Sequence, residues 1–203
     1  YYYRMVVVGQ MNEPIVIETV LSREEFEGLW QYFDRTQPAV NSLAIWTLNN
    51  ASYGKGDPVS WQHPLRTDLF FVKCATTIRL KMMKILKKDI QLCKIHANGQ
   101  TPGQNSLFHK DYPLDEVWTF ILFNQMQWNH EWGGEFVCKS PDGKLHYTPY
   151  IPNNGVFIPS NWEHKGHSPN SLIGNGYRTT VAFSFCIPEI HAHINSRQSR
   201  TWY

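Results

Sequence analysis

The chain has 203 residues, of which 42% are hydrophobic and 18% are charged, and its formal net charge is +2. This composition excludes an intrinsically disordered chain, and the small charge argues against binding to nucleic acid or to an acidic membrane. No apolar stretch approaches the ~20 residues of a membrane span, and the first residues lack the pattern of a signal peptide. We therefore expect one cytoplasmic domain that spans residues 1–203.

The four cysteines are far apart in the sequence and form no C-x-x-C pair. Dependence on disulfides is typical of much smaller, secreted domains. We therefore expect reduced thiols at Cys74, Cys93, Cys138 and Cys186.

A first helix is predicted to begin at Ser22. Ser22 and Glu25 have the spacing of a capping box, and Leu21 stands where a hydrophobic staple begins. The apolar residues that follow recur on one helical face, namely Phe26, Leu29, Trp30 and Phe33.

A loop and a second helix are predicted to follow. The stretch Asn41–Trp61 is rich in Asn, Gly, Ser and Trp and has neither the helical nor the strand period, so we expect a loop that could close over a site as a lid. A second helix is predicted over Leu69–Lys88. Its apolar stripe is formed by Ile78, Met82 and Ile85, and its solvated side by Lys81, Lys84 and Lys88.

The chain changes character after Asp89. Short β-prone runs alternate with turn signals such as "NGQTPG", "SPDGK" and "IPNNG", which predicts about seven short strands in a sandwich or barrel. Helices followed by strands indicate an α+β fold, with N-terminal helices packed on a jelly-roll-like core. We expect a helical support region at 1–89, the core at 90–187 and a C-terminal arm at 188–203.

A candidate metal site begins with His109 and Asp111 in "SLFHKDYP". If Leu107–Asp111 is a strand, both side chains point to the same face, because strand side chains alternate. An H-x-D triplet alone is also compatible with a solvated surface pair. A third ligand is offered by His164 or His167 in "GVFIPSNWEHKGHSP". Two histidines and one carboxylate form the open facial triad of non-haem Fe(II) oxygenases, whereas structural zinc normally has four protein ligands.

A candidate anion site lies in "NGYRTTVAFSF". In a strand, Val181, Phe183 and Phe185 would be buried against the helices, and Arg178 and Thr180 would point inward. A buried guanidinium is costly unless it pairs with an anion, and it suits a carboxylate well. The alternative is an arginine at a strand end whose head reaches solvent.

Together these motifs resemble the prolyl 4-hydroxylase-like branch of the Fe(II)/2-oxoglutarate-dependent dioxygenases. The resemblance covers about residues 90–187 and rests on four segments in the family's order: "CKIHANGQTPGQNSLFHKD", "EWGGEFVC", "GVFIPSNWEHKGHSP" and "YRTTVAFSF". It implies a double-stranded β-helix in which His109, Asp111 and His164 bind Fe(II). It also implies that Arg178, assisted by Thr180, holds the distal carboxylate of 2-oxoglutarate.

The resemblance implies a hydroxylase. Such an enzyme uses O2 and decarboxylates 2-oxoglutarate to succinate and CO2 while it hydroxylates a C–H bond, with ascorbate as a reductant in some members. Related halogenases have a small residue in place of Asp111, so the retained carboxylate argues against halogenation. Substrates within the branch include free amino acids, peptidyl residues such as proline, and small molecules.

Two residues stand near the position where many members of the branch have a tyrosine that binds 2-oxoglutarate. His96 lies near that position, and Asn98 follows two residues later on the same strand face. His96 is either a co-substrate contact or a histidine of the core.

Aromatic residues surround the motifs, and most aromatic residues belong to cores. Trp118 is expected in the core. Trp132 and Trp162 are either core residues or parts of the pocket mouth, Tyr112 is a further substrate-binding candidate, and Glu135 either binds substrate or caps its hairpin.

Two other classes of function compete with the hydroxylase. The first is a non-catalytic cupin-like module that holds zinc or manganese, in which Arg178 is structural. The second is a nucleic-acid demethylase, which the small net charge disfavours.

Overall fold

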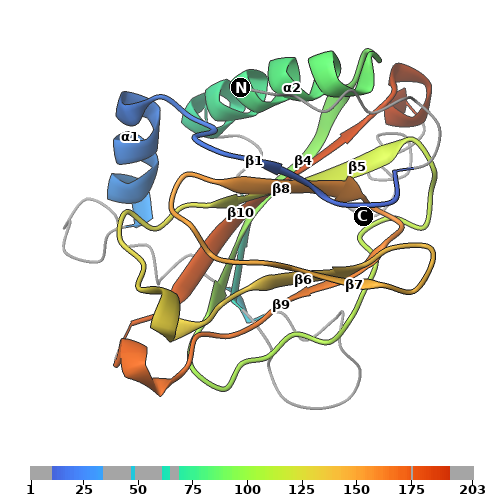
Figure 1. The fold of residues 1–203 in the computed structure, drawn as a ribbon. Helices are drawn as coiled ribbons and strands as arrows, with labels where there is room; N and C mark the ends of the chain where they lie inside the picture. The colour runs from blue at the N-terminus through green and yellow to red at the C-terminus, as the bar shows by residue number, and fades with distance from the viewer. Residues whose placement is uncertain (1–10, 34–46, 49–60, 65–68, 175, 193–203) are drawn as a thin grey trace.

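The computed structural model describes residues 11–33, 47–48, 61–64, 69–174 and 176–192, and all structural statements below concern these residues. They form two α-helices, α1 (Arg23–Phe33) and α2 (Leu69–Leu86), and two antiparallel sheets. Figure 1 shows both helices over one face of the larger sheet and the smaller sheet below its other face. None of the described helices is long and apolar enough to cross a membrane.

The larger sheet has seven strands in the order β1-β8-β5-β10-β4-β3-β2. Its central strand, β10, pairs with β4 on one side and with β5 on the other. In chain order the seven strands are β1 (Ile15–Ile17), β2 (Thr47–Leu48), β3 (Trp61–Pro64), β4 (Gln91–Gln100), β5 (Val117–Phe123), β8 (Gly155–Pro159) and β10 (Arg178–Cys186).

The smaller sheet has three strands in the order β7-β6-β9, with β6 (Phe136–Lys139) in the middle of β7 (Leu145–Thr148) and β9 (Glu163–Gly166). An isolated bridge between His109 and His164 adds one residue of a further segment beside β9. Two single-turn 3-10 helices, η2 (His130–Trp132) and η3 (Ser171–Ile173), lie close to each other near one end of this sheet.

The predicted helices are confirmed. The Ser22 hydroxyl accepts a hydrogen bond from the Glu25 amide at 3.2 Å, and the Glu25 carboxylate accepts one from the Ser22 amide at 3.0 Å, which is the expected capping box. The second helix ends two residues earlier than predicted, at Leu86. Its stripe residues Ile78 and Met82 are fully buried.

The number of strands after Asp89 is also confirmed, since β4 to β10 are seven strands in the described chain. Two boundaries differ from the prediction. Thr47–Leu48 forms a short strand within the expected loop, Trp61 begins β3, and residues 49–60 lie outside the described part, so the lid is untested. The segment Leu107–Asp111 is irregular and not a strand, apart from the bridge at His109.

Two apolar cores lie on the two faces of the larger sheet. The first joins the helices to the sheet and includes Val181, Phe183 and Phe185, as the alternation of β10 predicted, together with Trp118. The second lies between the two sheets and includes Ala182 on the opposite face of β10. Polar side chains of β10 that share a face with Ala182 therefore point between the sheets, where the candidate site lies.

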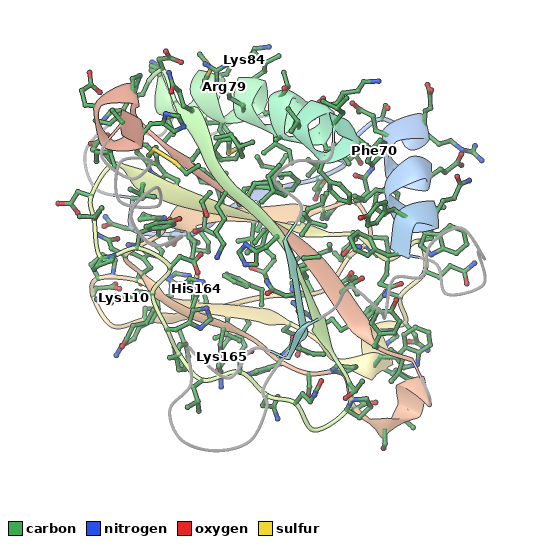
Figure 2. All side chains as sticks on the ribbon, turned by 180° about the vertical axis from the view of Figure 1, so that it is seen from behind. Phe70, Arg79, Lys84, Lys110, His164 and Lys165 are labelled. Carbon is green, nitrogen blue, oxygen red and sulfur yellow. A yellow bond between two sulfur atoms is a disulfide. The ribbon has the colours of Figure 1, made fainter. Side chains whose placement is uncertain are left out.

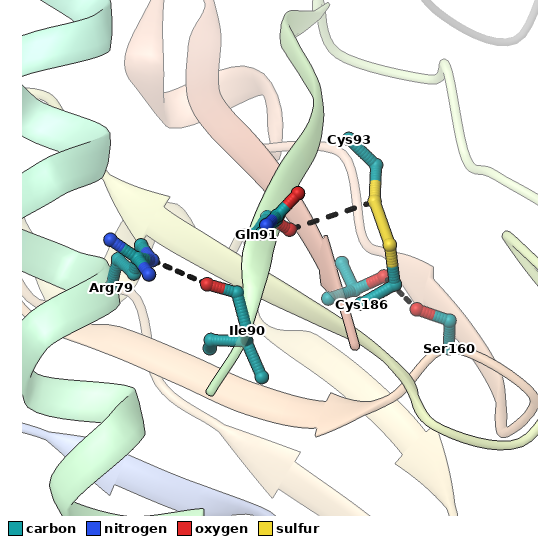
Figure 3. Close-up of a disulfide and its surroundings, with 7 residues drawn as sticks. Arg79, Ile90, Gln91, Cys93, Ser160 and Cys186 are labelled. Atoms are coloured by element: carbon teal, nitrogen blue, oxygen red, sulfur yellow. Dashed lines mark hydrogen bonds between the residues drawn. A yellow bond between two sulfur atoms is a disulfide. The ribbon is translucent and has the colours of Figure 1, made fainter. Parts of the chain in front are cut away.

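The prediction of four reduced thiols is wrong for two cysteines, because Cys93 and Cys186 form a disulfide (Figure 3). The strand register explains the pair. Ser184 pairs with Lys94 and Phe185 with Leu92, so Cys93 is the extra residue of a β-bulge and lies near Cys186 on the neighbouring strand. Cys74 and Cys138 form no disulfide among the described residues, as predicted, and both are buried.

The segment predicted as a C-terminal arm begins as a short helix. Residues 188–192 are helical, and Ile190 packs against the cluster formed by Cys93, Cys186 and Val117. Residues 193–203 lie outside the described part of the chain.

A thiol titration tests the disulfide. In denaturant without reductant, two thiols per chain, Cys74 and Cys138, should react, and all four should react after reduction. Because the bridge closes a long loop, reduction should lower the free energy of unfolding by about 2–4 kcal/mol. Four reactive thiols before reduction would show that Cys93 and Cys186 are not bonded in solution.

Candidate metal centre

Three predicted ligands come together between the two sheets. The imidazole nitrogens of His109 and His164 and a carboxylate oxygen of Asp111 all lie within 4.8 Å of one another. The Asp111 oxygens are 3.8 Å from His109 Nε2 and 3.6 Å from His164 Nε2. Ligand atoms that share one ion at about 2.0–2.2 Å must lie within twice that distance of each other, and both measured separations meet this limit.

The backbone sets the orientation of both imidazoles. The amide of His109 donates to the His164 carbonyl at 3.0 Å, and the His164 amide donates to the His109 carbonyl at 2.9 Å. The Nδ1 atom of each ring lies 3.0 Å from the carbonyl oxygen two residues earlier, Leu107 for His109 and Trp162 for His164. In the neutral form of the ring, an Nδ1–H that donates to a carbonyl leaves Nε2 unprotonated, so in this form the Nε2 atom of each histidine can bind a metal ion.

A short chain of hydrogen bonds fixes Asp111. The Thr119 hydroxyl donates to the Asp111 carboxylate at 2.6 Å and lies 2.8 Å from the Ser160 hydroxyl. The Asp111 amide donates to the Ser160 carbonyl at 3.1 Å. Burial alone would raise the pKa of Asp111, but the charge of His164, with hydrogen bonds from His164 and Thr119, holds this pKa well below its usual range. The carboxylate is therefore ionised and ready to bind a cation.

The charge of Asp111 acts in return on His164. Burial would lower the pKa of His164, whereas the Asp111 charge, its hydrogen bond and the Trp162 carbonyl raise it, with a net rise. A cation is thus favoured at this point of the structure, whether it is a proton or a metal ion.

The arginine predicted to bind an anion is buried between the sheets. The Arg178 side chain is 2% exposed, so the alternative of a head in solvent is excluded. Its Nε donates to the Gly134 carbonyl at 2.8 Å, its Nη1 donates to Gln100 Oε1 at 2.9 Å, and the guanidinium lies 5.4 Å from the centre of the Tyr150 ring. These partners are neutral, and Nη2 has no hydrogen-bond partner in the described structure.

Two glycines allow this packing. A Cβ atom at Gly166 would lie 3.0 Å from both Arg178 Nη1 and Gln100 Oε1, and Gly134 has a positive φ of 83° next to Trp128 and Arg178. The Gly-Gly hairpin therefore positions the guanidinium through a backbone carbonyl. Burial lowers the pKa of Arg178 to about 10, so the group still carries its charge at neutral pH without an acidic hydrogen-bond partner.

Three other predicted co-substrate contacts lie on the same inner face. Asn98 and Ala97 of β4 pair with Thr180 and Val181, and His96 pairs with Ala182, so His96, Asn98 and Thr180 share the face of Ala182. Burial, followed by the charge of Lys94, lowers the pKa of His96 to about 3, so its imidazole is neutral. Its Nδ1 atom is buried without a hydrogen-bond partner among the described residues.

The candidate substrate-binding residues lie in different parts of the structure. Trp162 is 6% exposed and belongs to the core between the sheets, so it does not face a pocket mouth. Trp132 is partly buried, and its ring packs edge-on against Trp128 with centroids 5.4 Å apart. Tyr112 follows Asp111 directly and packs beside the Cys93–Cys186 pair.

Glu135 lies apart from the three metal-ligand candidates. Its carboxylate is 3.5 Å from His167 Nδ1, and both residues, with Lys165, line a cavity of about 590 Å³. On β9, His164 and Gly166 point to the interior, so Lys165 points to the other side of the smaller sheet (Figure 2). His167 follows directly after β9, and its amide donates to the Glu135 carbonyl at 2.9 Å. His167, the alternative ligand, is therefore not part of the metal-ligand cluster.

Three polar residues of this face were not predicted from the sequence. Lys94 lies two residues before His96 on β4, Thr119 interrupts the apolar run of β5, and Gln100 ends β4 opposite Arg178. The two residues of β4 could have been found by extending the alternation from His96 and Asn98. Nothing in the sequence pairs Thr119 with Asp111.

Comparison with solved structures shows which fold this is. The Pseudomonas putida prolyl-4-hydroxylase matches with a TM-score of 0.62 and 14% identity, over 86% of this chain and 92% of that chain. A Trichoplax adhaerens prolyl hydroxylase, solved with a hypoxia inducible factor peptide, matches with a TM-score of 0.68 and 12% identity, over 90% and 87%. HygX from Streptomyces hygroscopicus, solved with nickel and 2-oxoglutarate, matches with a TM-score of 0.60 and 12% identity, over 86% and 83%.

The chain therefore has the fold of prolyl-4-hydroxylases and other 2-oxoglutarate-Fe(II) oxygenases, and the resemblance drawn from its motifs is confirmed at that level. No protein-family model matches the sequence. No curated protein matches it either.

Replacement of Thr119 tests the support of Asp111. Thr119→Val keeps the shape of the side chain but removes the hydroxyl that donates to Asp111, so it should weaken metal binding by about 10–100-fold. Thr119→Ser restores the hydroxyl and should recover most of the affinity. Titration with Fe(II) under anaerobic conditions, or with Ni(II), measures the effect; equal affinities of wild type and Thr119→Val would contradict it.

The pH dependence of unfolding tests the burial of His96. Between pH ~6.5 and ~3 the unfolded state binds a proton at His96 that the folded state does not, so this residue makes stability fall as pH falls. The loss amounts to at most about 1.4 kcal/mol per pH unit. Metal-free His96→Gln should lose less stability than wild type between pH 6.5 and 4, whereas His130→Gln, at an exposed position, should behave as wild type. If the free energy of unfolding of His96→Gln and of wild type falls equally with pH, His96 is not buried in its neutral form.

Proposed function

We propose that the protein is an Fe(II)- and 2-oxoglutarate-dependent dioxygenase with a double-stranded β-helix core, which hydroxylates a C–H bond of an amino-acid, peptidyl or small-molecule substrate. The main support for this proposal is the buried guanidinium of Arg178, which has only neutral hydrogen-bond partners. It lies between the sheets, as do His109, Asp111 and His164. A structural arginine would be expected to pair its charge or to reach solvent. A buried cation beside a metal triad suits a chelating ligand with a second, distal carboxylate.

Each metal ligand has a defined role in this proposal. His109 and His164 would hold iron through Nε2 and Asp111 through its carboxylate, and three protein ligands would leave the coordination of the ion open. Iron and 2-oxoglutarate, when bound, supply the oxidant from O2 with release of CO2 and succinate. The hydrogen bonds from Thr119 and the histidine-anchoring carbonyls hold the three ligands in place before the ion arrives.

The co-substrate would lie along the inner face of β4 and β10. Arg178 Nη2, which lacks a partner, donates to the distal carboxylate, and the Thr180 hydroxyl adds a second donor on the same face. Asn98 and the neutral imidazole of His96 flank the path from Arg178 to the metal ligands. The unpartnered His96 Nδ1 is a hydrogen-bonding group of the kind that the family's tyrosine supplies.

The structural neighbours support this reading without deciding it. HygX was solved with nickel and 2-oxoglutarate, and the Trichoplax prolyl hydroxylase with a peptide. Tyr112, which directly follows Asp111 in the chain, remains a substrate-binding candidate in this proposal.

An anaerobic spectrum tests the proposal. Protein loaded with Fe(II) and 2-oxoglutarate should develop a weak visible charge-transfer band, because chelation places the keto oxygen on the metal. Asp111→Ala should abolish the band, and Arg178→Met should raise the 2-oxoglutarate concentration needed for it by about tenfold or more.

The matched control is His167→Ala, which removes the histidine outside the metal-ligand cluster and should leave the band unchanged. Iron-loaded wild-type protein that shows no band would favour the cupin-like metal-binding module. Preferential binding of Zn(II) or Mn(II) without any effect of 2-oxoglutarate would favour the same module.

A further inference from the structure

A row of polar side chains crosses the inner face of the larger sheet beside the metal ligands, and the proposed function leaves two of them without a role. Ser184 of β10 pairs with Lys94 of β4 on one side and with Thr119 of β5 on the other. Residues directly opposite each other in neighbouring strands point to the same face. Because Thr119 donates to Asp111, the whole row faces the metal ligands.

Lys94 points into this space with its charge unpaired. The side chain is partly buried and forms no hydrogen bond or ion pair with any described residue. Lys94 lies two residues before His96 on the same face of β4, and it stands opposite Ser184, which in turn stands opposite Thr119, the residue that donates to Asp111. The strand register therefore places this ammonium in one row with the residue that supports a metal-ligand candidate.

Ser184 is a second, independent sign of a missing ligand. Its side chain is 1% exposed, yet its hydroxyl has no hydrogen-bond partner in the described structure. A buried hydroxyl without a partner costs free energy unless something satisfies it. An ammonium and an unsatisfied hydroxyl directly opposite each other on paired strands offer the donors that an anion needs.

The co-substrate does not account for Lys94. Arg178 pairs with Gln100, and Lys94 lies six positions before Gln100 along β4, which is about 20 Å in a strand. The carbon chain of 2-oxoglutarate spans only about 5 Å at ~1.5 Å per bond. His96 and Asn98 lie on the same face between the two ends, so a co-substrate held at Arg178 runs along these residues and stops at the metal.

The charges lead to the same conclusion. A divalent iron ion and Arg178 are balanced by Asp111 and the two carboxylates of 2-oxoglutarate. Lys94 then remains as a cation without a counter-ion, next to another cation, in a partly buried space. This arrangement is unfavourable until an anion enters.

We propose that the primary substrate is a small molecule with an anionic group, a carboxylate or a phosphate, and that Lys94 and the Ser184 hydroxyl bind this group beside the metal. The inference rests on the proposed function for the identity of the site, but the anion-binding row is a property of this chain's own residues. It narrows the substrate from any amino acid, peptide or metabolite to small anions.

Binding without turnover tests the substrate class. Protein loaded with Ni(II) and 2-oxoglutarate is titrated by calorimetry with L-amino acids and their primary amides, and with sugar phosphates and the unphosphorylated sugars. In at least one pair the anion should bind about tenfold or more tightly than its neutral counterpart, and the pair that responds distinguishes a carboxylate from a phosphate. The same compound should stimulate succinate formation by the Fe(II) protein.

Three variants assign the effect to Lys94. Lys94→Met should lose the preference for the anion, Lys94→Arg should keep most of it, and Lys165→Met, on the other side of the smaller sheet, should keep all of it. Ser184→Ala should weaken binding of the anion by a smaller factor. In Lys94→Met the affinity for 2-oxoglutarate should be unchanged.

Several results would overturn the inference. The inference is wrong if every anion of the panel binds no more tightly than its neutral partner. It is also wrong if Lys94→Met keeps the full preference for the anion. Loss of 2-oxoglutarate binding in Lys94→Met would assign the lysine to the co-substrate instead. Failure of wild-type protein to bind 2-oxoglutarate would refute the proposed function. In that case, titration of metal-free protein with the amino acids and their amides would still show whether Lys94 binds an anion.

Discussion

The structure depends on the complete burial of strand β10. Every residue from Arg178 to Cys186 is buried, because the helices and their core cover one face and the smaller sheet covers the other. A strand in this position can place polar side chains only where partners satisfy them. On the helix side the strand is apolar from Val181 to Phe185, with the buried Thr179 satisfied by Gln125, and on the other side it has Arg178, Thr180 and Ser184. The polar residues of this one face define the length and chemistry of the site.

The groups around β10 are positioned largely by the backbone. The two histidines are anchored through Nδ1 to carbonyls of their own chain segments, and Arg178 is anchored to the carbonyl of Gly134. Such contacts do not depend on flexible side chains, so the ligand atoms are held in one orientation without a bound ion. The glycines of the hairpin contribute the close approach that a larger residue would block.

The unsatisfied atoms of the site are concentrated where ligands would sit. Buried atoms without hydrogen-bond partners include Arg178 Nη2, His96 Nδ1 and the Ser184 hydroxyl, and all three belong to the inner face of β4 and β10. Each would be costly in a site that never binds anything. Their order along the strands, from Arg178 past His96 to Ser184 and Lys94, suggests two adjoining ligands with the metal between them.

The sequence by itself determined the fold class, the helix cap, the number of core strands and the three residues that come together as a candidate metal site. Those features depend on local periodicity and on short motifs, such as H-x-D and the alternation of "YRTTVAFSF", which a single segment contains. Only the tertiary structure decided the pairing of Cys93 with Cys186, the support of Asp111 by Thr119, the burial of Trp162 and the alignment of Lys94 with Ser184 and Thr119. Each of these joins strands or segments far apart in the chain, and a bulge of one residue or a shift of register changes which side chains meet, so local sequence cannot fix them.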